Sequence, residues 1–226
     1  MSEWWTYSPS DFLLFSPDTY YRLFELYNRW VWPGHILALG AGVAILALLR
    51  DGRTWRGRAI SALLAACWLW VAWAYLLSRY DTINWAARYF AIAFAIEALL
   101  LIGAGVVSGA LRFAPAAHAA GRLGLATFVF ALVAQPLMGP LVGRDWLQAE
   151  IFGLAPDPTA VGTLGILLSA AKPVRWELLV IPLLWCVVSG ATLWTMGSPD
   201  ALVLPVAAAL GLALGAWKSW HPRARR

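Results

Sequence analysis

Four polar residues lie inside or beside long apolar segments, where polar side chains are costly and are usually functional. Glu97 stands in the middle of an apolar run, AIAFAIEALLL. Gln135 precedes a proline in a second run, and Asp157 and Thr159 flank a proline at the start of a short third run. We take these four residues as the candidate ligand or proton site.

Glu97 is the most informative of the four because no Lys or Arg is expected at its depth in any apolar run. The side chain is then expected to be a neutral carboxylic acid whose partner is Gln135, a tryptophan N–H of the run 59–77, or a water. Such a group either cross-links helices or forms a proton or cation site, and the sequence leaves both alternatives open.

The apolar run from Thr159 to Ala171 is too short to cross a bilayer. Its 13 residues make a helix of about 20 Å, against a hydrocarbon core of about 30 Å. Asp157 is expected to cap the helix, with a proline at its first position. The loop 150–156 would then dip into the membrane toward a protein-lined cavity. In the alternative, residues 151–154 extend the helix and Pro156 only kinks it.

The sequence contains no set of residues that is typical of a cofactor or metal site. His35, His118 and His221 are not expected to share a depth, so neither a haem nor a three-histidine metal site is predicted. Cys67 and Cys186 lie in apolar runs and are read as small buried hydrophobes. Nucleotide-binding and hydrolase motifs are absent. We therefore expect no cofactor and no metal, and the sequence gives no positive sign of an enzyme.

The composition requires a membrane for most of the chain. Of its 226 residues 61% are hydrophobic and 13% are charged, whereas soluble domains have about a quarter charged residues. The pattern predicts an all-α, polytopic bundle of about seven spans with a short, broken fifth span. The predicted spans are 34–49, 59–77, 85–111, 123–141, 159–171, 174–195 and 201–217. Gln135 and its proline should kink or end the fourth span.

The first 32 residues form an aromatic leader with its own helix. Ser16 is the expected N-cap, followed by Pro17. One face carries Tyr20 and Phe24, so the helix is amphipathic and should lie in the membrane interface or act as a lid over an external cavity. The chain thus divides into the leader 1–32, the membrane domain 33–217 and a basic tail 218–226.

Charge and tryptophan placement predict the orientation. Seven spans with the N-terminus outside place 12 of the 17 basic residues on the inner side, which favours N-out and C-in. Most of the 15 tryptophans fall at span ends, as in an interfacial aromatic belt. Two G-x-x-x-G pairs, 105/109 and 211/215, indicate close helix packing within the bundle or self-association.

The leader, the stretch NWAARYFAIAFAIEALLL and the region QPLMGP…FGLAPDPTAVGTLGILL together resemble an uncharacterised bacterial family of multi-pass membrane proteins, known only as a domain of unknown function. The resemblance covers nearly the whole chain. It implies a bacterial inner membrane, a similar helix count and no activity. That family often has Cys before the proline where this chain has Asp157, so the resemblance does not imply soft-metal binding here.

Two function classes follow. The first is a transporter or channel-like protein for a small polar solute, ion or proton, with an outward cavity at Glu97, Gln135, Asp157 and Thr159. The second is a non-catalytic accessory subunit of a larger membrane complex. The expected partners are the lipid bilayer, such a solute, and further copies or other membrane subunits, but no nucleic acid.

Overall fold

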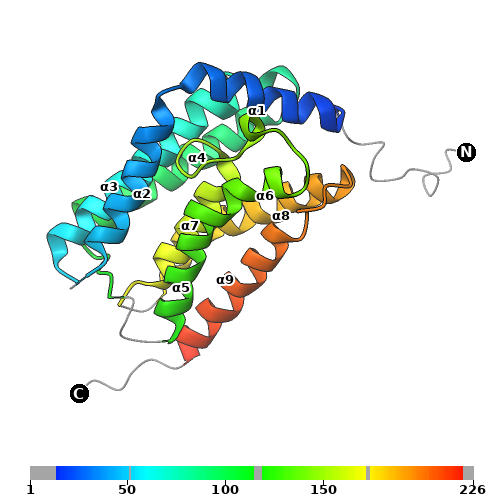
Figure 1. The fold of residues 1–226 in the computed structure, drawn as a ribbon. Coiled ribbons are helices and arrows are strands. Elements are labelled where there is room, and N and C mark those ends of the chain that lie inside the picture. Colours follow the sequence, from blue (N-terminus) through cyan, green and yellow to red (C-terminus); the bar gives the residue numbers. More distant parts are fainter. Residues whose placement is uncertain (1–13, 51, 115–118, 172–173, 221–226) are drawn as a thin grey trace, which may run out of the picture.

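The computed structural model describes residues 14–50, 52–114, 119–171 and 174–220. The start of the leader with Trp4 and Trp5, His118, Lys172, and the basic tail from His221 onward lie outside these residues. Within them the chain is helical, and the one β-bridge pairs Phe113 with Ala170. The fold is a helical bundle with α1 lying across one end (Figure 1).

The α-helices and their bounds are α1 (Pro17–Val31), α2 (Gly34–Leu48), α3 (Thr54–Trp70), α4 (Ala87–Leu101), α5 (Ala119–Val129), α6 (Gln135–Leu141), α7 (Pro156–Leu168), α8 (Val180–Thr195) and α9 (Val203–Trp220). Wider π-helical turns continue three of them, namely η3 (Val71–Leu77), η5 (Ile102–Val107) and η7 (Phe130–Ala134). Short 3₁₀ turns form η4 (Tyr80–Thr82), η8 (Trp146–Gln148) and η9 (Trp176–Leu178).

Five helical stretches among the described residues are long and apolar enough to cross a membrane, and a sixth is added if the bent pair α1 and α2 counts as one span. The five are Thr54–Thr82, Ala87–Val107, Ala119–Leu141, Trp176–Thr195 and Val203–Trp220. They match five of the seven predicted spans. The polytopic helical class is confirmed, whereas the count of seven and the orientation stay predictions.

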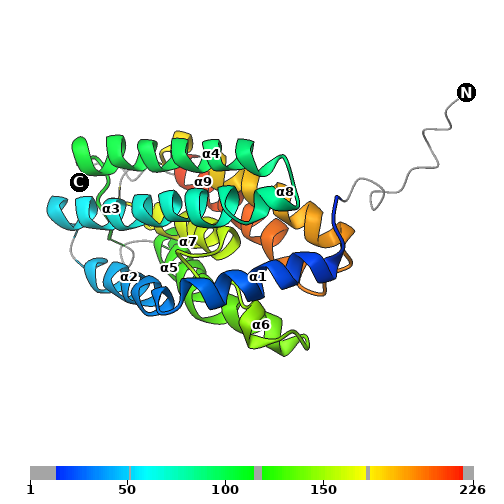
Figure 2. The ribbon, with the colours of Figure 1, turned by 90° about the horizontal axis from the view of Figure 1, so that it is seen from above.

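The predicted fifth span is α7, and it forms the centre of the bundle. All 13 of its residues are buried. It contacts α3, α5, α8 and α9, and Figures 1 and 2 both show it enclosed by other helices. A helix of about 20 Å that spans no full bilayer is stable here because every face is covered by protein.

The segment before α7 is irregular and buried, as the broken-entry alternative expected. Phe152 and Leu154 are buried, and Gly153 has a φ of 80° with its N–H donated to Thr159 Oγ1 at 2.9 Å. The expected cap was wrong, because α7 begins at Pro156 and its N-cap is Ala155. The proline has a fixed φ suited to a first helical turn and holds the preceding residue in extended backbone.

The leader helix α1 packs its apolar face against protein. Ser16 caps it as predicted and accepts a hydrogen bond from the Thr19 N–H. Phe24 stacks on Tyr75 with ring centroids 4.9 Å apart, and Tyr27 donates to the Leu154 carbonyl at 3.1 Å. α1 meets α2 at a bend of 89° and therefore covers the end of the bundle, including the segment before α7.

Prolines and glycines shape the remaining contacts. The fourth predicted span does not end at Pro136, because η7 widens the helix just before it and α6 carries on to Leu141. The wider turn accommodates the missing proline N–H. Glycines of both predicted pairs pack internally, with Gly105 against Ser61 and Gly211 against Leu183.

Candidate functional site

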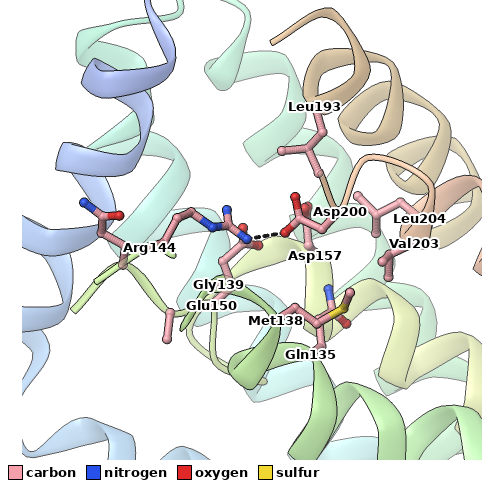
Figure 3. Close-up of a pocket in the computed structure, with 12 residues that line it drawn as sticks. Gln135, Met138, Gly139, Arg144, Glu150, Asp157, Leu193, Asp200, Val203 and Leu204 are labelled. Carbon is pink, nitrogen blue, oxygen red and sulfur yellow. Dashed lines mark hydrogen bonds and ion pairs between the residues drawn. The ribbon is translucent and has the colours of Figure 1, made fainter. Parts of the chain in front are cut away.

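The candidate site is a small polar cavity at the end of the bundle that α1 covers. Gln135 reaches it from the start of α6, and Asp157 reaches it from the first turn of α7. Arg144 and Glu150 come from the loop between α6 and α7, and Asp200 comes from the turn between α8 and α9 (Figure 3). The cavity volume is about 20 Å³, enough for about one water molecule.

Asp157 is the best-held carboxylate of the site. Its Oδ1 accepts hydrogen bonds from the Trp185 indole N–H at 2.7 Å and from the Ser189 hydroxyl at 2.8 Å. The residue is 1% exposed. It also lies in the first turn of α7, where the positive end of the helix dipole favours a negative group. α8 thus fixes the position of this carboxyl group.

Glu150 lines the same cavity as Asp157. Burial raises the pKa of the Glu150 carboxyl well above its ordinary value, and the negative charge of Asp157 raises it further. Arg144 acts in the opposite direction but does not reverse the shift. Glu150 Oε2 is buried without a hydrogen-bond partner. Two buried carboxyl groups in one small cavity favour a shared proton, because two negative charges close together in a buried setting cannot both be stable.

Arg144 is the cation of the cavity. Its guanidinium donates to Asp200 Oδ2 and lies over the ring of Tyr21, 4.5 Å from the ring centroid. Burial lowers the pKa of Arg144, but Asp200, Tyr21 and Glu150 together raise it above its ordinary value. The Arg144 and Asp200 side chains are only 13% and 11% exposed. The cavity therefore places three carboxyl groups against one guanidinium.

Two further spaces adjoin the carboxyl cavity. Arg144 and Gln148 line both this cavity and an open hollow of about 850 Å³ beside α1. A second small cavity of about 40 Å³ is lined by Tyr20, Tyr75 and Ser189. Because Ser189 donates to Asp157, polar groups continue from this tyrosine-lined cavity to the carboxyl pair.

The structure brings together two of the four predicted site residues. Gln135 and Asp157 line one cavity, whereas Thr159 donates to the Ala155 carbonyl at 2.6 Å and lines no part of it. Glu97 lies on α4 with no exposed surface, and neither carboxyl oxygen has a hydrogen-bond partner. It is not among the residues lining the carboxyl cavity. Trp68, one of the tryptophans of the run 59–77 that were expected to reach Glu97, donates its indole N–H to Thr163 instead.

Sequence reasoning did not assign Arg144, Glu150, Asp200, Trp185 or Ser189 to the site. The signal for the acids was present, since acidic residues gather at the predicted outer ends of the spans. Their convergence could not be read from the sequence, because Glu150 precedes α7 whereas Asp200 follows α8, and only the crossing of the helices brings them together. Trp185 and Ser189 are four residues apart on α8 and so share one face.

Helices long and apolar enough to span a bilayer, packed around a buried polar centre, define an integral membrane protein of the all-helical class. Residues 17–226 match DUF6064, a family of unknown function, and the chain belongs to that family. No curated protein and no solved structure matches the chain.

Proposed function

We propose that this protein is a proton-coupled carrier of a small cation, with the carboxyl cavity as its substrate site. The observation that carries the proposal is that the Glu150 and Asp157 carboxyl groups line one small buried cavity beside a single guanidinium, Arg144. Three carboxyl groups against one fixed cation favour a positively charged substrate over an anion or a neutral solute.

Coupling follows from competition for the same carboxyl groups. A proton stabilises the Glu150–Asp157 pair while the cavity holds no other cation, because a second negative charge is costly in this buried setting. An entering cation would offset that charge and release the proton. Exchange of one positive charge for another is the minimal step that links a proton gradient to cation movement.

The proposed route to this site starts at the open hollow beside α1. Arg144 separates the hollow from the carboxyl cavity and is held there by Asp200 and by the ring of Tyr21. Tyr21 also shares a 2.7 Å hydrogen bond with Ser198, next to this ion pair. In the proposal, movement of Arg144 away from Asp200 opens the site, and this end is the one that the charge distribution predicts to face outward.

Proton flux in proteoliposomes tests the proposal. Vesicles of phosphatidylethanolamine and phosphatidylglycerol would enclose a pH-sensitive dye in an acidic lumen, and Na⁺, K⁺, methylammonium or guanidinium would be added outside in turn. At least one cation should release lumenal protons faster than in protein-free vesicles. Asp157→Asn should return the rate to the protein-free value, because a neutral amide cannot exchange a proton for a cation.

Asp81→Asn is the matched control, since Asp81 pairs with Arg88 and is not among the residues lining the carboxyl cavity. It should keep the wild-type rate. If none of the four cations moved protons, or if Asp157→Asn transported as the wild type does, the carrier proposal would be lost.

An accessory subunit is the second candidate, and α2 favours it. This helix buries only Ala38, Gly42 and Ile45 against the rest of the chain. Leu37 is 78% exposed, and a side chain added at Gly40 would meet nothing within 4 Å. An open, small-residue position on an apolar face allows close approach of another helix. Purification in mild detergent should then yield a second membrane protein that Gly40→Leu releases.

A further inference from the structure

An apolar groove runs along the outside of the bundle between α5 and α9, and one end of it borders the carboxyl cavity, with which it shares Met138 and Val203. Its volume is about 530 Å³. It extends from Leu123 and Leu214 at one end to Met138 and Leu202 at the other, and Val161 of α7 forms part of its floor. Figure 1 shows α5 and α9 side by side over this length.

The groove opens toward the surroundings of the bundle. Leu123, Val206 and Leu210 line it and are 51%, 54% and 48% exposed. Both walls belong to stretches apolar and long enough to span a membrane. Lipid chains are therefore the solvent at this surface, and a groove of this kind would be filled from the bilayer.

We propose that the groove holds one acyl chain of an anionic phospholipid. The volume of the groove favours an acyl chain as the occupant and not a helix of a partner protein. A helix about 22 Å long and 10 Å wide occupies roughly 1,700 Å³, about three times the space of the groove. An extended hydrocarbon chain needs no polar partners, and this agrees with a lining that is apolar except for Thr127.

A positive charge at one end of the groove favours a lipid with a negatively charged headgroup. Arg122 is exposed beside Leu123 and makes no ion pair with any residue that the structure describes. Trp217, 45% exposed, follows Leu214 by one turn on α9. A basic residue and a tryptophan at the same end are typical of the level of lipid phosphates. Arg122 is thus placed to bind a negatively charged headgroup.

Native mass spectrometry of the purified protein, with phosphatidylglycerol or phosphatidylcholine added, tests this site. The wild type should retain one phosphatidylglycerol molecule. Ala126→Phe should lose it, because the ring would occupy the groove that Ala126 lines. Ala209→Phe is the matched control, since Ala209 is exposed on α9 and is not among the groove residues. Arg122→Gln should weaken phosphatidylglycerol binding about fivefold.

Thermal melting would confirm that both phenylalanine variants fold, and Val206→Phe replaces Ala126→Phe if that variant does not. Retention of the lipid by every folded groove variant would overturn the site. Equal binding of the two lipids by the wild type would overturn the headgroup assignment. A copurifying protein that Ala126→Phe releases would show that a polypeptide, and not a lipid, fills the groove.

Discussion

Two buried carboxyl groups of this protein have opposite surroundings. Asp157 accepts hydrogen bonds from Trp185 and Ser189, whereas both oxygens of Glu97 lack a partner. A buried polar group without a partner loses its hydration and forms no hydrogen bond in return, which costs about 1–3 kcal/mol of folding free energy. The two residues are therefore expected to respond differently to substitution.

Glu97→Met should stabilise the protein. Methionine has a similar length and no polar atoms, so the substitution removes an unsatisfied group and is expected to contribute about 1–3 kcal/mol. Thermal unfolding in detergent measures this, with Glu97→Gln as a control that keeps an unsatisfied amide and should show no gain. A lower melting temperature for Glu97→Met would mean that Glu97 has a stabilising partner.

Glu150 should make stability depend on pH. Burial raises the pKa of its carboxyl, so between the ordinary pKa of 4.5 and the higher folded value the folded state binds more protons than the unfolded state. Stability must then fall as pH rises through that window. The charged groups of the cavity are Asp157, Arg144 and Asp200.

Denaturation midpoints from pH 5 to pH 8 should therefore decline for the wild type and decline less for Glu150→Gln, which cannot ionise. Parallel declines for the two proteins would contradict the raised pKa of Glu150.

At the level of elements, a pair of glycines sets the position of the central helix. A Cβ at Gly165 of α7 would lie 2.5 Å from the Gly124 carbonyl oxygen of α5, and a Cβ at Gly124 would lie 2.5 Å from the Gly165 carbonyl oxygen. The two backbones are in direct contact, and Ser169 adds a hydrogen bond to the Gly121 carbonyl. This crossing holds α7 in place and, through its first turn, Asp157.

Gly165→Ala should destabilise the bundle by about 1–3 kcal/mol, the usual cost of overpacking a tight interior. Gly103→Ala serves as the matched control, because a Cβ there meets nothing within 4 Å and alanine favours a helix. Thermal unfolding of both variants in one detergent gives the comparison. Equal melting temperatures would show that α5 and α7 separate easily.

For the whole molecule, the predicted orientation sets the direction of any transport. The side chains of Trp146 and Trp55 are 68% and 55% exposed. In the predicted topology the two residues lie at opposite ends of the bundle. The native thiols Cys67 and Cys186 are buried and free, so they give little background in labelling.

A membrane-impermeant maleimide should label Trp146→Cys in intact spheroplasts and Trp55→Cys only after lysis, because the less basic end should face outward. Unsubstituted protein reports the background from the two native thiols. The reverse pattern of labelling would place the carboxyl cavity at the cytoplasmic side.

The sequence by itself determined the helical membrane class and the Ser16 cap of α1. It offered the broken entry before α7 and the internal packing of Gly105 and Gly211 each as one of two alternatives. These features depend on local composition, periodicity and turn chemistry, which residues close in the chain define. It also indicated Gln135 and Asp157 as polar groups in costly positions.

Only the tertiary structure decided which polar groups meet. Arg144 and Glu150 stand in the loop between α6 and α7, whereas Asp200 stands in the turn between α8 and α9, and their convergence depends on how the helices cross. It also separated Glu97 from the cavity lining and made α7 a fully buried centre instead of one more lipid-facing span. The physical reason is that packing in three dimensions sets burial and charge proximity, and neither depends on sequence spacing alone.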